Sequence, residues 1–309
     1  MYQLLAALIP LVFLYAYMLF TSIEYGTSFF LLFPKILRND ILLKQAISPI
    51  WETTNVFLVF TIICIFTFFP KSTYFFGTNL IVPLLIAFLF LGVRSACMLF
   101  LFYGDMDSKL IRIVFFLSCF LAPLFFSSGF VYMITGNTTN LFLQNLNLPI
   151  YALVLSNILL ISGSFYQFYS KNKSDFHLLR RILSFSYVIF VLSLILFMYD
   201  LIHTSSWMLL SDANLHIYSS IIIFLLLSSL VFFVARKHLL LFLTISLLMG
   251  AVLFFFALLH LPYLIYPSIT IYNAFTDLKT FQLMLWSFGI GMVFVIPSLI
   301  FLYILLLKE

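Results

Sequence analysis

The stretch that decides the fold of this 309-residue chain is Leu80-Ile-Val-Pro-Leu-Leu-Ile-Ala-Phe-Leu-Phe-Leu91, a run of twelve apolar residues. Strands of a membrane β-barrel alternate apolar and polar side chains with a period of two, and this stretch shows no such alternation. It lies within an apolar segment over about residues 78–103, and a helix needs about 20 mostly apolar residues to cross a bilayer. We therefore expect a membrane-spanning helix here rather than a barrel strand.

The composition of the whole chain predicts the same class of protein. Hydrophobic residues make up 64% of the chain and charged residues 8%, whereas soluble domains have about 45–50% and about 25%. A chain of this kind cannot cover its surface with polar groups in water, which excludes a soluble domain, a disordered chain and a nucleic-acid-binding module. We expect an all-α integral membrane protein that is surrounded by the lipid bilayer and binds no nucleic acid.

Nine segments are long and apolar enough to cross the membrane. They cover residues 4–33, 51–70, 78–103, 111–134, 149–170, 180–201, 217–235, 238–262 and 281–307. The seventh and eighth are separated only by Arg236-Lys237-His238, which is typical of a tight turn at a membrane surface.

The basic residues support this count, because each additional span moves every later loop to the other side of the membrane. With nine spans, twelve of the fifteen Lys and Arg residues fall on one side. These are Lys35, Arg38, Lys44, Lys109, Arg112, Lys171, Lys173, Arg180, Arg181, Arg236, Lys237 and Lys308. Only Lys71 and Lys279 fall on the other side, and Arg94 lies within a span. Since cytoplasmic loops carry the excess of basic residues, we expect the N-terminus outside and the C-terminus in the cytoplasm.

Two charged residues lie deep within predicted spans, where a charge costs at least about 2.5–3.5 kcal/mol at the helix centre. Glu24 and Arg94 each lie about nine residues before the cytoplasmic end of their span, or roughly 13 Å deep. The two side chains are at matching depth and can pair with each other or with other polar groups. A pair would either fix helix packing or place a buried carboxylate in a proton path, with Arg94 lowering its pKa.

A third acidic residue, Glu52, lies at the mouth of the second span, in Ser48-Pro-Ile-Trp-Glu-Thr-Thr-Asn55. Ser48 and Pro49 are typical of a helix start, and an acid in the first turn of a helix interacts favourably with the helix dipole. The polar side chains of this stretch also suit an entrance for proton uptake, because Glu52 and Asn55 are three residues apart and share a helix face. Both interpretations of Glu52 remain open at this stage.

The sequence contains no recognisable redox, metal or catalytic motif. His260 is the only histidine within an apolar run, whereas a b-type haem needs axial ligands on facing helices. The cysteines Cys64, Cys97 and Cys119 are not spaced as a metal or redox pair and are expected to be small apolar packing residues. We predict no cofactor, no metal and no catalytic residue in this chain.

Three stretches together resemble subunit II of the cytochrome bd-type quinol oxidases. They are Ile23-Glu-Tyr-Gly26 with Phe33-Pro-Lys-Ile-Leu-Arg-Asn-Asp40, Ser48-Pro-Ile-Trp-Glu-Thr-Thr-Asn-Val-Phe57, and Val82-Pro-Leu-Leu-Ile-Ala-Phe-Leu-Phe-Leu-Gly-Val-Arg94. The second is similar to the family signature Pro-x-Trp-Asp-Gly-Asn-x-Val-Trp. The chain departs from the family pattern where Glu24 and Glu52 replace aspartates, Thr53 and Thr54 replace Gly-Asn, and Phe57 replaces a Trp. It therefore resembles a divergent member.

The resemblance implies a fold of nine helices, arranged as two four-helix bundles and one peripheral helix. We accordingly divide the chain into a first bundle over residues 1–134, a second over residues 135–265 and a ninth helix over residues 266–309.

The resemblance also implies a function within a respiratory complex of the bacterial cell membrane. The complex would oxidise quinol and reduce dioxygen to water, with b- and d-type haems carried by the partner subunit I. This chain would stabilise subunit I in a heterodimer and line routes for protons and oxygen, and a small single-helix accessory subunit is a further expected partner. By position, Trp51 and Glu52 would lie at the proton entry, with Glu24 and Arg94 in the buried polar network behind them. We place Asn55 in the same proton path because it shares a helix face with Glu52, and Glu24 belongs to this path as well. Thr53 and Thr54 are expected to complete the polar network.

A stand-alone transporter with a polar path of Glu24, Glu52 and Arg94 is the alternative function. Transporters often have helices broken at corresponding positions of two halves. Pro10 and Pro83 lie within spans here, but the second half has no matching pair.

Overall fold

The computed structural model describes residues 2–32, 41–102, 104, 108–136, 146–169, 176–204 and 212–308, and these residues are almost entirely helical. The elements are α1 (Tyr2–Leu31), α3 (Ile41–Phe68), α4 (Pro70–Asn79), α5 (Ile81–Phe102), α6 (Lys109–Thr135), α7 (Asn147–Tyr169), α8 (Phe176–Thr204), α9 (Asp212–Val234), α10 (His238–His260), β1 (Tyr263–Ile265), β2 (Ile269–Thr270) and α11 (Leu278–Lys308). Within these ranges nine helices are long and apolar enough to cross a membrane, all but the short α4. The predicted nine-helix membrane fold is therefore confirmed for the described part of the chain.

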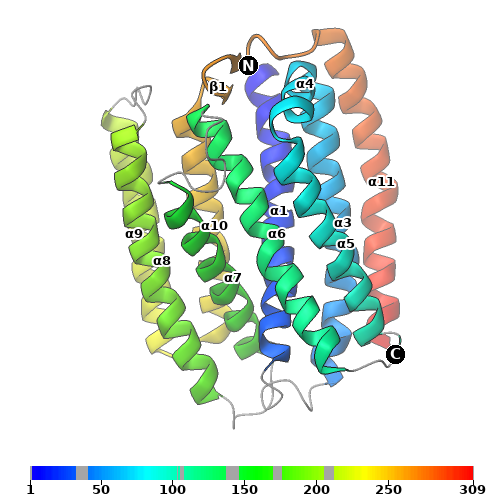
Figure 1. The fold of residues 1–309 in the computed structure, drawn as a ribbon, viewed down its shortest axis with the longest axis vertical. Coiled ribbons are helices and arrows are strands. Elements are labelled where there is room, and N and C mark those ends of the chain that lie inside the picture. The colour runs from blue at the N-terminus through cyan, green and yellow to red at the C-terminus, as the bar shows by residue number, and fades with distance from the viewer. Residues whose placement is uncertain are drawn as a thin grey trace.

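The nine long helices run side by side along the long axis of the molecule, and the two chain ends lie at opposite ends of it (Figure 1). Helix α1 contacts helices from both halves of the chain, namely α3, α6, α7 and α10. Helix α11 packs on α3, and α9 packs on α10. The division into two bundles and a ninth helix stays a prediction, and α1 is the element that joins the two halves.

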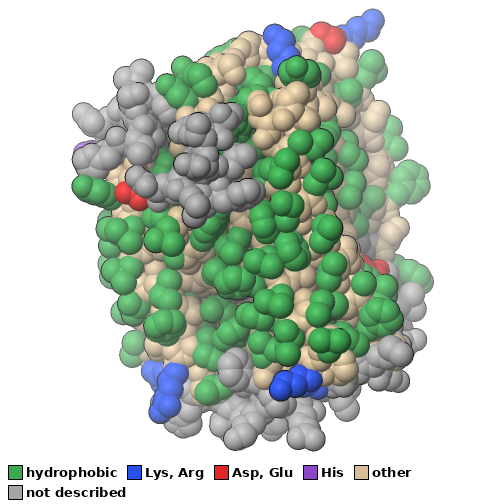
Figure 2. Space-filling model, viewed as in Figure 1, with side chains coloured by type: hydrophobic (Ala, Val, Ile, Leu, Met, Phe, Trp, Pro, Cys, Tyr) green, Lys and Arg blue, Asp and Glu red, His purple; other side chains and the backbone are tan. Residues whose placement is uncertain are grey.

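The surface between the two ends is apolar. Figure 2 shows hydrophobic side chains over much of the middle of the visible face, and the Lys and Arg side chains that it colours lie near the two ends. Among the described residues, Lys71 and Lys279 lie at the end where α1 begins. At the other end lie Lys109, Arg112, Arg180, Arg181, Arg236 and Lys237, together with the helix positions of Lys44 in α3 and Lys308 in α11. Lys35, Arg38, Lys171 and Lys173 are outside the described residues. The orientation across the membrane stays a prediction.

Helix α3 begins earlier than the sequence suggested. We expected Ser48 and Pro49 to start the helix, but α3 begins at Ile41 and contains Pro49 in its interior. A proline inside a membrane helix is tolerated where nearby side chains satisfy the freed backbone groups. The helix-start interpretation of Ser48-Pro49 is therefore wrong, and Glu52 lies eleven residues into α3.

Two short elements that the sequence did not predict lie at the end where α1 begins (Figure 1). Helix α4 starts with Pro70, a residue favoured in the first helical turn because its missing N–H needs no partner there. Strands β1 and β2 pair as an antiparallel hairpin. The hairpin connection docks on the end of α6, where the Tyr266 N–H donates to the Met133 carbonyl at 3.0 Å. Gly136 ends α6 in the left-handed conformation, against the Tyr266 carbonyl.

Candidate functional site

Two opposite charges are completely enclosed between α1 and α5. The Arg94 Nη1 donates to Glu24 Oε2 at 3.1 Å, and the two side chains are 1% and 0% exposed. Glu24 lies seven residues before the end of α1, and Arg94 eight residues before the end of α5, which places both about 10–12 Å from the helix ends. The pairing that the sequence left open is therefore formed. Each charge offsets the desolvation cost of the other, which for a lone buried ion is several kcal/mol.

The Arg94 guanidinium also joins α3 to this pair. Its Nη2 donates to Asn55 Oδ1 on α3 at 3.0 Å and to Ser95 Oγ at 3.4 Å. The guanidinium carbon lies 5.6 Å from the centre of the Tyr25 ring, within cation–π distance. Three helices therefore meet at one planar cation, whose five donors suit several acceptors at fixed angles.

Neither member of the ion pair is fully satisfied by the described residues. Glu24 Oε1 and Arg94 Nε are buried and have no hydrogen-bond partner among those residues. A buried polar atom without a partner costs about 1–3 kcal/mol, more if charged, and water commonly satisfies such groups. The second carboxylate oxygen of Glu24 is therefore available to bind water or a proton.

Glu52 lies next to this network without joining it directly. It is half-buried and forms no ion pair or hydrogen bond with the described residues. It precedes Asn55 by three residues, so the two side chains lie about one turn apart on the same face of α3. Because α3 begins at the basic end of the molecule, Glu52 lies nearer that end than Asn55 does.

The other site residues predicted near Glu52 lie around the polar network of Glu24, Arg94 and Asn55. Trp51 is partly buried and packs against the core cluster that contains Tyr25. The hydroxyls of Thr53 and Thr54 donate to the carbonyls of Pro49 and Ile50 at 2.6 and 2.8 Å. The structure therefore places Thr53 and Thr54 on the same helix as Asn55, but it gives neither a hydrogen bond to Arg94.

A second polar contact fixes α1 against α7 just beyond Glu24. Gly26 faces Ser162 so closely that a Cβ on Gly26 would lie 1.8 Å from Ser162 Oγ. The Tyr166 hydroxyl donates to Thr27 Oγ1 at 2.7 Å. Sequence reasoning assigned no role to Ser162 or Tyr166 in this contact, because nothing in the sequence shows that α7 would face α1 here.

Sequence reasoning also missed the contacts of Tyr25 and Ser95. Each directly follows a predicted site residue, but neighbouring residues on a helix point about 100° apart. Adjacency in sequence therefore gave no signal that both would contact the Arg94 guanidinium.

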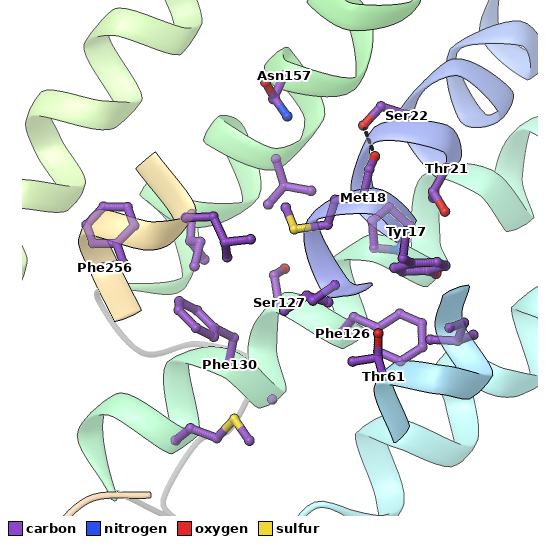
Figure 3. Close-up of a pocket in the computed structure, with 18 of the residues that line it drawn as sticks. Tyr17, Met18, Thr21, Ser22, Thr61, Phe126, Ser127, Phe130, Asn157 and Phe256 are labelled. Carbon is purple, nitrogen blue, oxygen red and sulfur yellow. Dashed lines mark hydrogen bonds between the residues drawn. The ribbon is translucent and has the colours of Figure 1, made fainter. Parts of the chain in front are cut away.

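A cavity of about 400 Å³ lies beside the ion pair, and α1, α3, α5, α6, α7, α8 and α10 all contribute to its lining (Figure 3). Most of its lining is apolar, including Met18, Phe130 and Phe256. Tyr17 and Tyr25 line it as well, and the ring of Tyr25 contacts the Arg94 guanidinium. The cavity is thus an apolar space with one edge at the polar network.

The described residues offer no evident metal site. No group of three or more His, Cys, Asp or Glu side chains in that part of the chain is placed to hold a metal ion. Cys64, Cys97 and Cys119 are free and buried, as expected for packing residues. His260 is the last residue of α10, and the lack of haem in this chain stays a prediction.

Comparison with known proteins gives consistent matches over almost the whole chain. The family model described as cytochrome bd terminal oxidase subunit II matches residues 2–306. The putative cytochrome bd menaquinol oxidase subunit II of Bacillus subtilis (strain 168) is 22% identical over 324 aligned positions, which cover 96% of this chain and 93% of that protein. A chain in the structure of bd oxidase from Geobacillus thermodenitrificans matches with a TM-score of 0.78 and 26% identity, and 99% of each chain is covered.

The chain therefore belongs to the cytochrome bd terminal oxidase subunit II family, and the resemblance seen in the sequence is confirmed. It is a multi-pass bacterial membrane protein and a subunit of an oxidoreductase complex that uses haem and quinol. These matches support the oxidase function and not the transporter alternative. The match to a bd oxidase structure also indicates that the chain works with partner subunits.

Proposed function

We propose that this chain is the non-haem member of a heterodimer with a haem-bearing subunit I, and that it brings protons into the complex through Glu52 and Glu24. The observation that carries the proposal is the placement of Asn55 and Arg94 between the two carboxylates. Asn55 is one turn from Glu52 and accepts from Arg94, and Arg94 in turn donates to Glu24.

The direction of the path follows from the distribution of charge. Glu52 lies toward the end of the molecule that carries most of the Lys and Arg residues, which is the cytoplasmic end by the positive-inside rule. Protons taken up there would reach Glu52 first and Glu24 second. The N-terminus would accordingly lie outside, at the other end of α1.

The two carboxylates are the groups in this path that exchange protons, because Arg94 stays protonated and an amide does not titrate. Arg94 and Asn55 instead position the path. The guanidinium holds one oxygen of Glu24 and leaves Oε1 without a partner among the described residues. Water that bridges Glu52, Asn55 and Glu24 Oε1 would complete the route, since ordered water serves as a relay between polar groups in apolar surroundings.

Trp51, Thr53 and Thr54 would shape the mouth of the route rather than carry protons. Their side chains pack in the core or donate to their own helix. The proposed oxygen route corresponds best to the apolar cavity beside the network, because dioxygen prefers apolar surroundings. The single-helix accessory subunit stays a prediction.

The substitution Glu52→Gln tests the proton route. It keeps the size of the side chain and removes the group that exchanges protons, so we expect oxygen consumption by the purified complex to fall about 10²-fold or more, the lower end of what a positioned proton-transfer group contributes. Haem content and co-purification of subunit I should stay near normal, since Glu52 makes no ion pair with the described residues.

Glu52→Asp is the matched control, because it keeps a carboxylate and shortens it by one methylene. It should retain more turnover than Glu52→Gln does. Equal oxygen consumption in the Gln variant and the parent would show that Glu52 has no part in proton uptake. A chain that purifies without a haem-bearing partner would contradict the heterodimer.

A further inference from the structure

Four basic residues from two distant parts of the chain gather at one end of the second half of the molecule. We call Arg180, Arg181, Arg236 and Lys237 the α8–α10 basic cluster. The first two lie near the start of α8 and the last two in the turn from α9 to α10. The Arg180 guanidinium lies 5.3 Å from the centre of the Phe233 ring of α9, which holds it beside the turn.

The cluster has no described counter-charge. Arg180 and Arg236 both act electrostatically on His238, the first residue of α10, so these like charges lie close to one another. None of the four basic residues forms a salt bridge with a described acid. Two acids of the second half whose side chains are described, Asp200 near the end of α8 and Asp277 just before α11, lie at the opposite end of the molecule. Folding thus concentrates positive charge where a membrane helix meets the lipid headgroups.

The turn between α9 and α10 fixes the position of this charge at a conformational cost. The N–H of Lys237 donates to the Phe232 carbonyl and that of Arg236 to the Phe233 carbonyl, the pattern of a Schellman helix end. That pattern requires a left-handed residue, usually glycine, and here it is Arg236 with φ 58°. The positive-inside rule requires only that basic residues lie somewhere in a cytoplasmic loop. It therefore does not explain why Arg236 adopts a left-handed conformation or why Arg180 is held against an aromatic ring.

An exposed apolar stripe runs from the cluster toward the middle of the membrane. Phe185, Val188 and Leu192 follow Arg181 at helical spacing on one face of α8, and they are 68%, 57% and 56% exposed. The basic cluster and this stripe therefore match the two parts of one ligand, a negatively charged head and a hydrocarbon chain.

From this arrangement we propose that the α8–α10 basic cluster binds an anionic phospholipid. The phosphate group lies among Arg180, Arg181, Arg236 and Lys237, and an acyl chain lies along Phe185 and Val188 of α8, below Arg181. Basic pockets between membrane helices are known sites for anionic headgroups. The site is separate from the proton route and does not depend on it.

Titration of the delipidated, purified oxidase complex with phosphatidylglycerol, followed by native mass spectrometry, tests this proposal. Each basic residue near a membrane surface strengthens anionic lipid binding by about fivefold. The apparent Kd should therefore rise about fivefold in Arg236→Gly and about 25-fold in Arg180→Gln/Arg236→Gly. The glycine variant also relieves the left-handed strain at this position, so a folding defect does not explain a loss of binding.

Lys71→Gln/Lys279→Gln is the matched control, because it removes two charges from the opposite end of the molecule. Its affinity for phosphatidylglycerol should stay within about twofold of the parent, and phosphatidylcholine should bind all variants equally. Unchanged affinity in Arg236→Gly, or an equal loss in the control, would overturn the proposal. Binding of soluble polyglutamate without binding of phosphatidylglycerol would overturn it as well, in favour of an acidic protein partner.

Discussion

The enclosed ion pair predicts a strong energetic coupling between Glu24 and Arg94. Arg94→Met leaves a buried carboxylate without a counter-charge and Asn55 without its donor. Removing one partner of a buried pair costs about 3–5 kcal/mol. Glu24→Gln keeps an acceptor for Arg94 but leaves the cation uncompensated, so we expect a cost near the lower end of that range.

The double variant Glu24→Gln/Arg94→Met should be more stable than the Arg94→Met variant. It contains no uncompensated buried charge, and replacing a whole buried pair with neutral groups of similar volume is often close to neutral. We therefore expect a coupling free energy of at least about 2 kcal/mol between the two positions, within the range seen for residues in one network.

Unfolding of the purified complex in mixed micelles, with an increasing mole fraction of dodecyl sulfate, measures these differences. The haem and subunit I that co-purify with each variant report assembly. Ser95→Ala is the matched control, because it removes only the 3.4 Å contact to Arg94 and should cost less than about 0.5 kcal/mol. The losses of unfolding free energy in the two single variants could instead add up to the loss in the double variant to within about 0.5 kcal/mol. That result would refute the argument, since independent sites behave in that way.

Two further predictions concern helix packing and helix capping. Gly26→Ala should lower the free energy of unfolding by about 1–3 kcal/mol through overpacking against Ser162, and adding Ser162→Gly should restore it in the same titration. Gly92→Ala has open space and should cost nothing, so equal losses at both glycines would contradict the packing argument. The hydroxyl and N–H of Thr280 donate to Asp277, which lowers the pKa of that carboxyl below its ordinary 3.8. Because this pKa is lowered, the ionised carboxylate stabilises the first turn of α11 above pH 3.8. This stabilisation is lost as the pH falls through the lowered pKa. Amide hydrogen exchange at that turn should show this acid dependence, and Asp277→Asn should remove it; the same acid dependence in both proteins would contradict the role of the carboxylate.

The candidate site was only partly predictable. The carboxylates and Arg94 stood out in the sequence because charge within a span is expensive, and their depth from the helix ends suggested that they meet. The start of α3 was misjudged because Ser48-Pro49 is typical of a helix start, whereas the structure continues the helix through Pro49 to Ile41. Hydrogen bonds such as that of Tyr166 to Thr27 could not be predicted from the sequence, since these two residues are 139 positions apart in the chain.

The sequence by itself determined the membrane class, the number of spans and the separation of basic residues between the two ends. These properties are local, because lipid offers no hydrogen bonds and each spanning segment must satisfy its own backbone. Only the tertiary structure decided which polar groups meet. Most of these helices are apolar around nearly their whole circumference, so the sequence does not show how each is rotated about its axis. Close contacts such as Gly26 on Ser162 set that rotation, and with it they bring Glu24, Asn55 and Arg94 to one point.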